Sequence, residues 1–121
     1  MSVKEFEEKY PEVAKRYIIV QGFAQETLSE EELMTFFNDV DEQGKPVFVT
    51  RKGVYVVTPA VSLDDFTYDY HAASELSVLV DENKLKILKN FYTVVTFAFE
   101  NNEKAVAISE DLNYLLGLEG A

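Results

Sequence analysis

Several residue types that carry chemistry in proteins are absent from this sequence or rare in it. There is no cysteine, which excludes disulfide bonds, thiolate metal sites and cysteine nucleophiles. One histidine, His71, is too few for a zinc site in a chain that also lacks cysteine. The five glycines are isolated and form no dinucleotide-binding or phosphate-binding loop pattern. We therefore expect neither a bound metal nor a cofactor.

Long apolar runs are also missing. No stretch approaches the roughly 18 consecutive apolar residues that a transmembrane helix needs. Residues 1–8 are rich in charge and lack the apolar core of a secretion signal. The sequence therefore predicts a cytoplasmic protein that does not interact with membranes, and the absence of cysteine agrees with a reducing compartment.

The polar residues form no catalytic pattern. Histidine-dependent catalysis would have to use His71, and no serine lies in a nucleophile-elbow pattern. Asp64, Asp65 and Asp69 are near enough in sequence to gather a hard cation, but adjacent acids point apart on a strand, and calcium-loop spacing is absent. We interpret these acids as solvated side chains and predict that the chain is not an enzyme.

Negative charge dominates the ionisable residues. The sequence has 22 acidic and 11 basic side chains and a formal net charge of −11. Residues 1–60 carry 7 basic and 11 acidic side chains, and residues 61–121 carry 4 and 11, so the acidity is spread over the chain. A polyanion repels nucleic acid and attracts basic proteins, so general nucleic-acid binding is not expected. The simplest interpretation is that the acidity confers solubility, as in many bacterial-type domains.

The apolar content is sufficient for a hydrophobic core. Of the 121 residues, 47% are hydrophobic, including nine phenylalanines and seven tyrosines, and this length fits one domain. We predict a single α+β domain over residues 1–121, with N-terminal helices, a mainly antiparallel sheet and a short C-terminal helix. The sheet would consist of a hairpin over 46–58 and a meander over 76–109.

Helices are expected ahead of the sheet. A capping-box pattern and an apolar stripe predict a helix over 3–13, followed by a short β-prone run over 17–20. A second capping box, formed by Ser29 and Glu32, predicts another helix, which would end at Gly44. The apolar residues expected along one face of this second helix are Leu33, Phe36, Phe37 and Val40.

The middle of the chain has the pattern of a β-hairpin. Two β-prone runs, 46–50 and 54–58, flank a turn in which Gly53 can adopt positive φ, and Pro59 ends the second run. Residues 62–65 could cap a helical turn, and residues 66–71 alternate aromatic and polar side chains as in a strand.

The remaining sequence predicts further strands and one helix. Strands are expected over 76–80, 85–88, 91–99 and 104–109, with turns at 81–84 and 100–103. A helix somewhere within 72–90 is the alternative, because the apolar spacing there does not exclude it. A short helix would begin at Ser109 and end at Gly117.

Residues 33–58 resemble a known family. An apolar helical stripe is followed by a Gly-x-Pro-Val segment at 44–47 and by a Thr-Arg-x-Gly hairpin at 50–53, and this order resembles the middle of Phd/YefM-type antitoxins. The resemblance covers 26 of the 121 residues. It implies an α/β domain that dimerises and binds operator DNA, with Arg51 and Lys52 as candidate nucleic-acid contacts, and a C-terminal segment that neutralises a toxin.

The functional hypothesis that follows is a protein-binding module that inhibits a basic partner. Such a module would be an antitoxin, an immunity protein or a phage-type inhibitor that imitates the charge of DNA. The candidate contact residues are Asp64, Asp65, Tyr68, Asp69 and Tyr70. An alternative for the aromatic residues of this stretch is that they face the core. Alternative functions are small-ligand binding and a structural role in a larger assembly.

Overall fold

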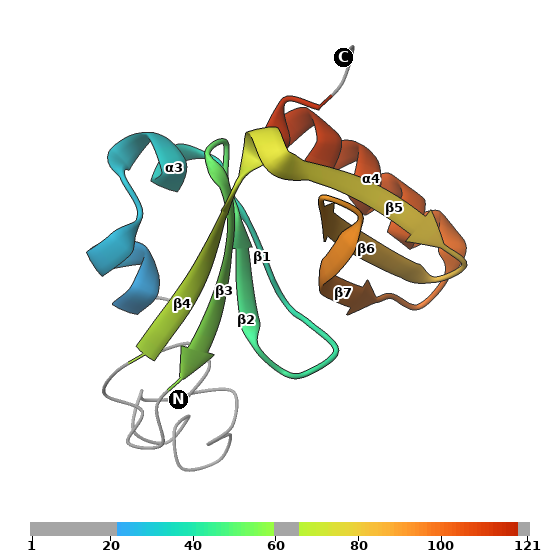
Figure 1. The fold of residues 1–121 in the computed structure, drawn as a ribbon, viewed down its shortest axis with the longest axis horizontal. Helices are drawn as coiled ribbons and strands as arrows, with labels where there is room; N and C mark the ends of the chain where they lie inside the picture. Colours follow the sequence, from blue (N-terminus) through green and yellow to red (C-terminus); the bar gives the residue numbers. More distant parts are fainter. Residues whose placement is uncertain (1–21, 60–65, 119–121) are drawn as a thin grey trace, which may run out of the picture.

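The computed structural model describes residues 22–59 and 66–118 and has an α+β fold with two antiparallel sheets (Figure 1). In chain order, the elements are a helical stretch over 22–27, α3 (Glu30–Met34), β1 (Phe37–Val40), β2 (Pro46–Val49), β3 (Gly53–Pro59), β4 (Phe66–Ala72), the 3-10 helix η1 (Ala73–Glu75), β5 (Leu76–Asp81), β6 (Lys84–Lys89), β7 (Tyr92–Ala98) and α4 (Asn102–Leu116). Sheet A has the order β1-β2-β3-β4, and sheet B has the order β5-β6-β7. The predicted α+β class and antiparallel pairing are confirmed.

Sheet A is the middle layer of the fold. The helical residues before β1 lie on one side of it, and sheet B and α4 lie on the other (Figure 1). Successive side chains of a strand point to opposite faces, so β2 and β3 contribute to two cores. This explains why both strands read as continuous apolar runs and not as alternating ones.

The two cores contain different residues. Four valines of β2 and β3 pack with sheet B and α4 in the larger core. The buried residues of this core are Val47, Val49, Val54, Val56, Leu76, Leu85, Ile87, Val95, Phe97, Leu112 and Leu116. The opposite face of sheet A forms the smaller core with the helical residues. Its buried members are Phe23, Ala24, Leu28, Phe48, Tyr55 and Val57.

The capping box at Ser29 is confirmed, but the long helix predicted after it is wrong. The Ser29 Oγ accepts a hydrogen bond from the Glu32 backbone N–H, and the Glu32 side chain accepts one from the Ser29 N–H. Helix α3 nevertheless ends at Met34, and residues 37–40 form β1. Pairing with β2 competes with the helical spacing here, because it places Phe37 opposite Val49 in a ladder that extends sheet A.

The C-terminal helix begins earlier than predicted. Residues 104–109 were expected to form a strand and Ser109 to begin a short helix, but both expectations are wrong. Helix α4 starts after Asn101, whose side chain accepts a hydrogen bond from the Lys104 N–H, and ends at Gly117 in the left-handed region at φ 72°. The buried positions of α4 follow helical spacing and pack against sheet B. The meander therefore ends at Ala98, not at 109.

Of the remaining secondary-structure predictions, most strands are confirmed, one helical alternative is wrong, and three segments lie outside the described residues. The hairpin over 46–58 is confirmed, with Val49 paired to Val54, and the strands over 76–80, 85–88 and 91–99 correspond to β5, β6 and β7. The helical alternative within 72–90 is wrong apart from the single turn η1. The predicted helix over 3–13, the run over 17–20 and the turn over 62–65 lie outside the described residues.

Gly53 is needed because another backbone passes close to it. A Cβ atom at this position would lie 2.1 Å from the carbonyl oxygen of His71 on β4, which is far closer than such atoms approach. We predict that Gly53→Ala lowers the free energy of unfolding by about 1–3 kcal/mol, since β3 and β4 must move apart.

Equilibrium urea denaturation measures this effect, and Gly22→Ala is the matched control. No atom lies within 4 Å of a Cβ built at Gly22, so the control should leave stability unchanged or slightly raised. Equal stability of the two variants would contradict the close approach.

Candidate functional site

Glu32 is a buried carboxylate that joins α3 to the β2–β3 hairpin. Glu32 is 2% exposed. Its Oε2 accepts hydrogen bonds from the Thr50 hydroxyl and the Tyr55 hydroxyl, each at 2.7 Å. Its Oε1 accepts from the Ser29 N–H at 3.2 Å and the Ser29 hydroxyl at 3.1 Å, and lies 3.8 Å from Lys52 Nζ. Both oxygens are therefore used within the protein.

These contacts shift two pKa values in opposite directions. Burial alone would raise the pKa of Glu32, but the hydrogen bonds from Tyr55, Thr50 and Ser29 together outweigh it, so the pKa of Glu32 lies below its ordinary value. Burial, and then the hydrogen bond and charge of Glu32, raise the pKa of Tyr55. Because both groups keep their ordinary charge states at neutral pH, we interpret the pair as structural.

The β4 strand carries three of the five residues predicted to bind a partner and directs them to opposite faces of sheet A. Tyr68 and Tyr70 share one face of sheet A with Tyr55, at ring-centroid distances of 5.8 and 4.9 Å. Each is 45% exposed, so neither is simply a core residue. Asp69 points to the opposite face and is exposed. Predicted contacts Asp64 and Asp65 lie outside the described residues.

His71 lies at the C-terminal end of β4. Its Nδ1 is buried and has no hydrogen-bond partner among the described residues. Burial, and then the positive charge of Lys89, lower the pKa of His71, while Asp69 and Glu75 act in the opposite direction. The imidazole is therefore mainly neutral at pH 7, and no carboxylate among the described residues is hydrogen-bonded to its Nδ1.

The tip of the β6–β7 hairpin exposes two aromatic side chains that the sequence reading placed in a strand. Phe91 is 99% exposed and Tyr92 is 78% exposed. Asn90 and Phe91 form the two-residue turn between paired Lys89 and Tyr92, with φ angles of 51° and 72°. Turns with two positive φ angles strongly favour glycine at the second position, so phenylalanine is unusual there. In the sequence, the only indication of this turn was Asn90, because asparagine tolerates positive φ.

An ion pair connects this hairpin tip to the end of β4. Lys89 Nζ lies 3.3 Å from Glu75 Oε2, on the turn η1 that directly follows β4. Lys89 is also the cation that acts on His71. Together, Tyr68, Tyr70, Phe91 and Tyr92 are four exposed aromatic side chains carried by these two linked segments, and we call them the aromatic set.

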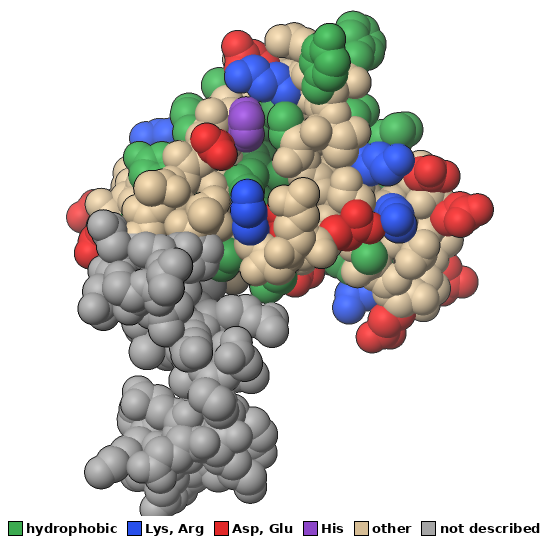
Figure 2. All heavy atoms as spheres, turned by 60° about the horizontal axis from the view of Figure 1, so that its bottom comes forward, with side chains coloured by type: hydrophobic (Ala, Val, Ile, Leu, Met, Phe, Trp, Pro, Cys, Tyr) green, Lys and Arg blue, Asp and Glu red, His purple; other side chains and the backbone are tan. Residues whose placement is uncertain are grey.

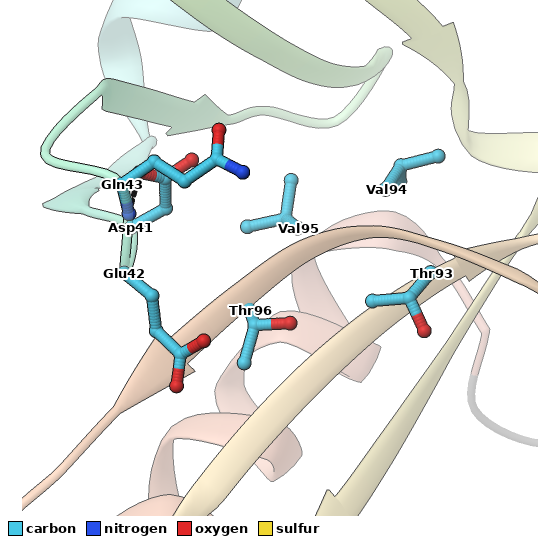
Figure 3. Close-up of a pocket in the computed structure, with 7 residues that line it drawn as sticks. All are labelled: Asp41, Glu42, Gln43, Thr93, Val94, Val95 and Thr96. Atoms are coloured by element: carbon cyan, nitrogen blue, oxygen red, sulfur yellow. Dashed lines mark hydrogen bonds between the residues drawn. The ribbon is translucent and has the colours of Figure 1, made fainter.

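A small polar cleft lies between the β1–β2 loop and β7 (Figure 3). Its volume is about 130 Å³, and Asp41, Glu42, Gln43 and residues 93–96 line it. Gln43 extends over the cleft towards Val95, whereas Glu42 lies beside Thr96. The Asp41 carboxylate already accepts hydrogen bonds from the Gln43 and Lys45 N–H groups. A cleft of this size has room for a few waters and is smaller than typical cofactor sites.

A larger groove of mixed polar and apolar lining separates residues 35–37 from the C-terminal half of α4. Two adjoining cavities of about 430 and 350 Å³ share Thr35, Tyr114 and Leu115 as lining residues. Arg51 borders one cavity and Asp111 borders the other. Both cavities are open to solvent, so the groove is shallow.

The predicted nucleic-acid contacts lie where the sequence placed them. Arg51 and Lys52 are exposed at the tip of the β2–β3 hairpin. Because Lys52 is paired with Glu32, its charge is partly compensated. In the coloured part of Figure 2, acidic and basic side chains are interleaved and do not form separate fields.

Metal geometry, membrane-spanning segments and known relatives add few constraints on the function of this chain. Within residues 22–59 and 66–118, no three acidic or histidine side chains gather as a metal site. No helix among the described residues has the length and hydropathy to cross a bilayer. The chain matches no protein-family model, no curated protein and no solved structure. The similarity to Phd/YefM-type antitoxins thus stays a prediction.

The Glu32 contacts predict a pH-dependent contribution to stability. We expect Glu32→Gln to lower the free energy of unfolding by about 1–3 kcal/mol at pH 7, because buried hydroxyl donors lose a charged acceptor. The pKa of Glu32 is lowered in the folded state, so its contribution is complete above the unfolded value near 4.5 and is lost as pH falls through the folded value.

Denaturation of both proteins at about pH 7 and about pH 3 tests this expectation. The difference in stability between wild type and variant should shrink at the lower pH. A difference that stays constant or grows on acidification would show that Glu32 is not held as a stabilised carboxylate.

The conformation of Phe91 predicts a stabilising substitution. Phe91→Gly should raise the free energy of unfolding by about 1 kcal/mol, because glycine adopts the left-handed region without a steric penalty. Phe91→Ala is the control, and it should change stability by less than about 0.5 kcal/mol because it keeps a Cβ atom and removes only exposed atoms. Thermal unfolding of the three proteins measures both effects. Destabilisation by glycine would mean that the phenyl ring supports the fold.

Proposed function

We propose that this chain is a cytoplasmic protein-binding module that inhibits or neutralises a basic partner protein. The observation that carries the proposal is the tip of the β6–β7 hairpin. Phe91 is almost completely exposed and occupies a backbone conformation that disfavours it. Strained backbone conformations of this kind cluster at functional sites, so we infer that the Phe91 side chain contacts a binding partner.

The rest of the aromatic set supports the same function. Phenylalanine and tyrosine supply large contact areas with few rotatable bonds and are enriched at protein interfaces. Tyr92, Tyr68 and Tyr70 are exposed to different degrees on segments that the Lys89–Glu75 ion pair connects. The aromatic set therefore offers aromatic contact area on two neighbouring segments of the surface.

The charge distribution supports a basic partner. Lys52, Lys84, Lys86 and Lys89 each lie within 4.0 Å of a carboxylate of this chain, so much of the positive charge is locally compensated. The formal net charge of −11 makes the long-range field of the protein negative. Such a field accelerates encounters with cationic proteins and repels polyanions.

Several kinds of inhibitor fit this description. An antitoxin, an immunity protein and a phage-type inhibitor that imitates nucleic-acid charge all act by covering a basic functional surface. The groove beside α4 favours a second candidate function, the binding of a small ligand, because its cavities of about 350 and 430 Å³ fall within the usual range for ligand sites.

Affinity capture from the native host tests the proposed function. The immobilised chain should recover a basic protein at low salt and release it at about 0.5 M salt, where the Debye length is short. The recovered protein's own activity should fall when the chain is added back. A combined Phe91→Ser and Tyr92→Ser variant should lose at least about tenfold in recovery, since exposed aromatic anchors dominate binding energies.

Tyr114→Ser is the matched control, because Tyr114 is 76% exposed on α4 at the groove. This variant should recover the partner as the wild type does. An empty eluate at both salt concentrations would contradict the proposed function. Loss of recovery confined to Tyr114→Ser would move the binding surface to the groove.

A further inference from the structure

We propose that the outer edge of β4 binds an extended, basic segment of the partner as an additional strand of sheet A. This inference rests on the proposed function and specifies how the partner is held. It follows from the direction of backbone groups along β4, from the side chains at the same positions, and from the composition and regular register of residues 66–72.

The β3–β4 ladder determines which backbone groups of β4 point outward. The Ala73 N–H donates to the Lys52 carbonyl at 2.9 Å, just beyond the last pair of the ladder. Hydrogen-bonded and non-hydrogen-bonded pairs alternate along an antiparallel ladder. The same register therefore directs the N–H and C=O groups of His71 and Asp69 towards β3.

Tyr68 and Tyr70 occupy the alternate positions, so their backbone groups point away from β3. The other side of β3 gives the same phase, because the Thr50 N–H donates to the Gly53 carbonyl and the next residue of β3 must turn towards β4. In the described part of the chain, no strand lies beside this outer edge. Two residues thus present donors and acceptors at the spacing that an added strand uses.

The side chains along the edge favour a particular partner sequence. Tyr68 and Tyr70 are each 45% exposed on one face, while Asp69 is exposed on the other. In an added strand, a residue opposite Asp69 would face a carboxylate, and residues opposite the tyrosines would face aromatic rings. An extended segment that alternates β-branched residues with Lys or Arg matches both faces.

Three common protections against strand addition are missing from β4 itself. Proteins protect exposed edges with proline, lysine or β-bulges, and residues 66–72 contain no proline or lysine and keep an unshifted register. The other three edge strands of the two sheets are less open to an added strand. β1 has four residues, α4 packs against β5, and the Glu42 N–H donates to the Thr96 carbonyl of β7.

Charge argues against a second copy of this chain as the occupant. Two chains would each carry a net charge of −11. In the symmetric antiparallel arrangement centred on Asp69, the two Asp69 carboxylates would also lie directly opposite each other, which is destabilising. A basic segment of another protein removes both problems.

Strand addition is tested with the ¹⁵N-labelled chain and the peptide acetyl-Val-Lys-Val-Arg-Val-amide. Binding should slow amide hydrogen exchange at Tyr68 and Tyr70. Tyr68→Pro removes the outward N–H without removing a β3–β4 hydrogen bond and should raise the peptide Kd about tenfold or more, whereas Tyr68→Phe, which keeps the N–H and the aromatic ring, should change it by less than about threefold.

The charge requirement has its own matched pair of variants. Asp69→Lys should weaken binding of this peptide and allow binding of the version in which Glu replaces Lys and Arg. Glu110→Lys makes the same change in charge on the exposed face of α4 and should keep the original preference. Equal effects of the two variants would show that overall charge, not the β4 edge, selects the peptide.

Methylated peptides keep the test valid if Tyr68→Pro fails to fold. N-methylation at the peptide positions that face β4 should abolish binding to the wild-type chain, and N-methylation at the intervening positions should not. Equal binding of both peptides, or protection confined to residues outside 66–72, would overturn the inference. Peptide-free dimers of the wild-type chain that Tyr68→Pro abolishes in sedimentation would also overturn it, because the occupant would be a second copy.

Failure of this inference is distinguishable from failure of the proposed function. A basic protein that is captured at low salt equally well by wild type, Tyr68→Pro and Asp69→Lys would leave the proposed function standing and exclude strand addition. Absence of any captured basic protein would contradict the proposed function itself.

Discussion

The antiparallel pairing of β3 with β4 is the constraint on which the candidate binding surface depends. It runs from Gly53 opposite Ala72 to Pro59 opposite Phe66 without a shift in register. Because side chains alternate along a strand, one register decides both which side chains face the helical layer and which backbone groups face outward. A shift by one residue would move the tyrosines to the other face of sheet A. The close approach of Gly53 to the His71 carbonyl shows how tightly this register is set.

The β2–β3 hairpin is held in place by hydrogen bonds to a residue that is distant in sequence. Glu32 is 18 residues from Thr50 and 23 from Tyr55, yet its carboxylate holds both hydroxyls. The Ser29–Glu32 spacing indicated a helix start, and that was correct, but no local pattern could show that the same carboxylate reaches across to sheet A. Tertiary hydrogen bonds of this kind leave no periodic signal, so this part of the site could not be predicted.

Sequence patterns predicted the elements best where one local interaction dominates. The β2–β3 hairpin has β-branched runs and the β5–β6 pair has aliphatic runs around short turns, and both were predicted correctly. Residues 37–40 and 104–109 were assigned to the wrong class, because their apolar spacing fits two structures and packing decides between them. For the candidate site, alternation placed Tyr68 and Tyr70 on one face of a strand, while the exposure of Phe91 depended on a turn whose residues are unusual for its backbone angles.

Cross-saturation NMR of the labelled chain in complex with its captured partner tests the central claim most directly, since it maps the contacting residues without altering them. The account predicts the strongest saturation transfer at Tyr68, Tyr70, Phe91 and Tyr92. Transfer concentrated on Tyr114 and the neighbouring residues of α4, with the aromatic set unaffected, would contradict it.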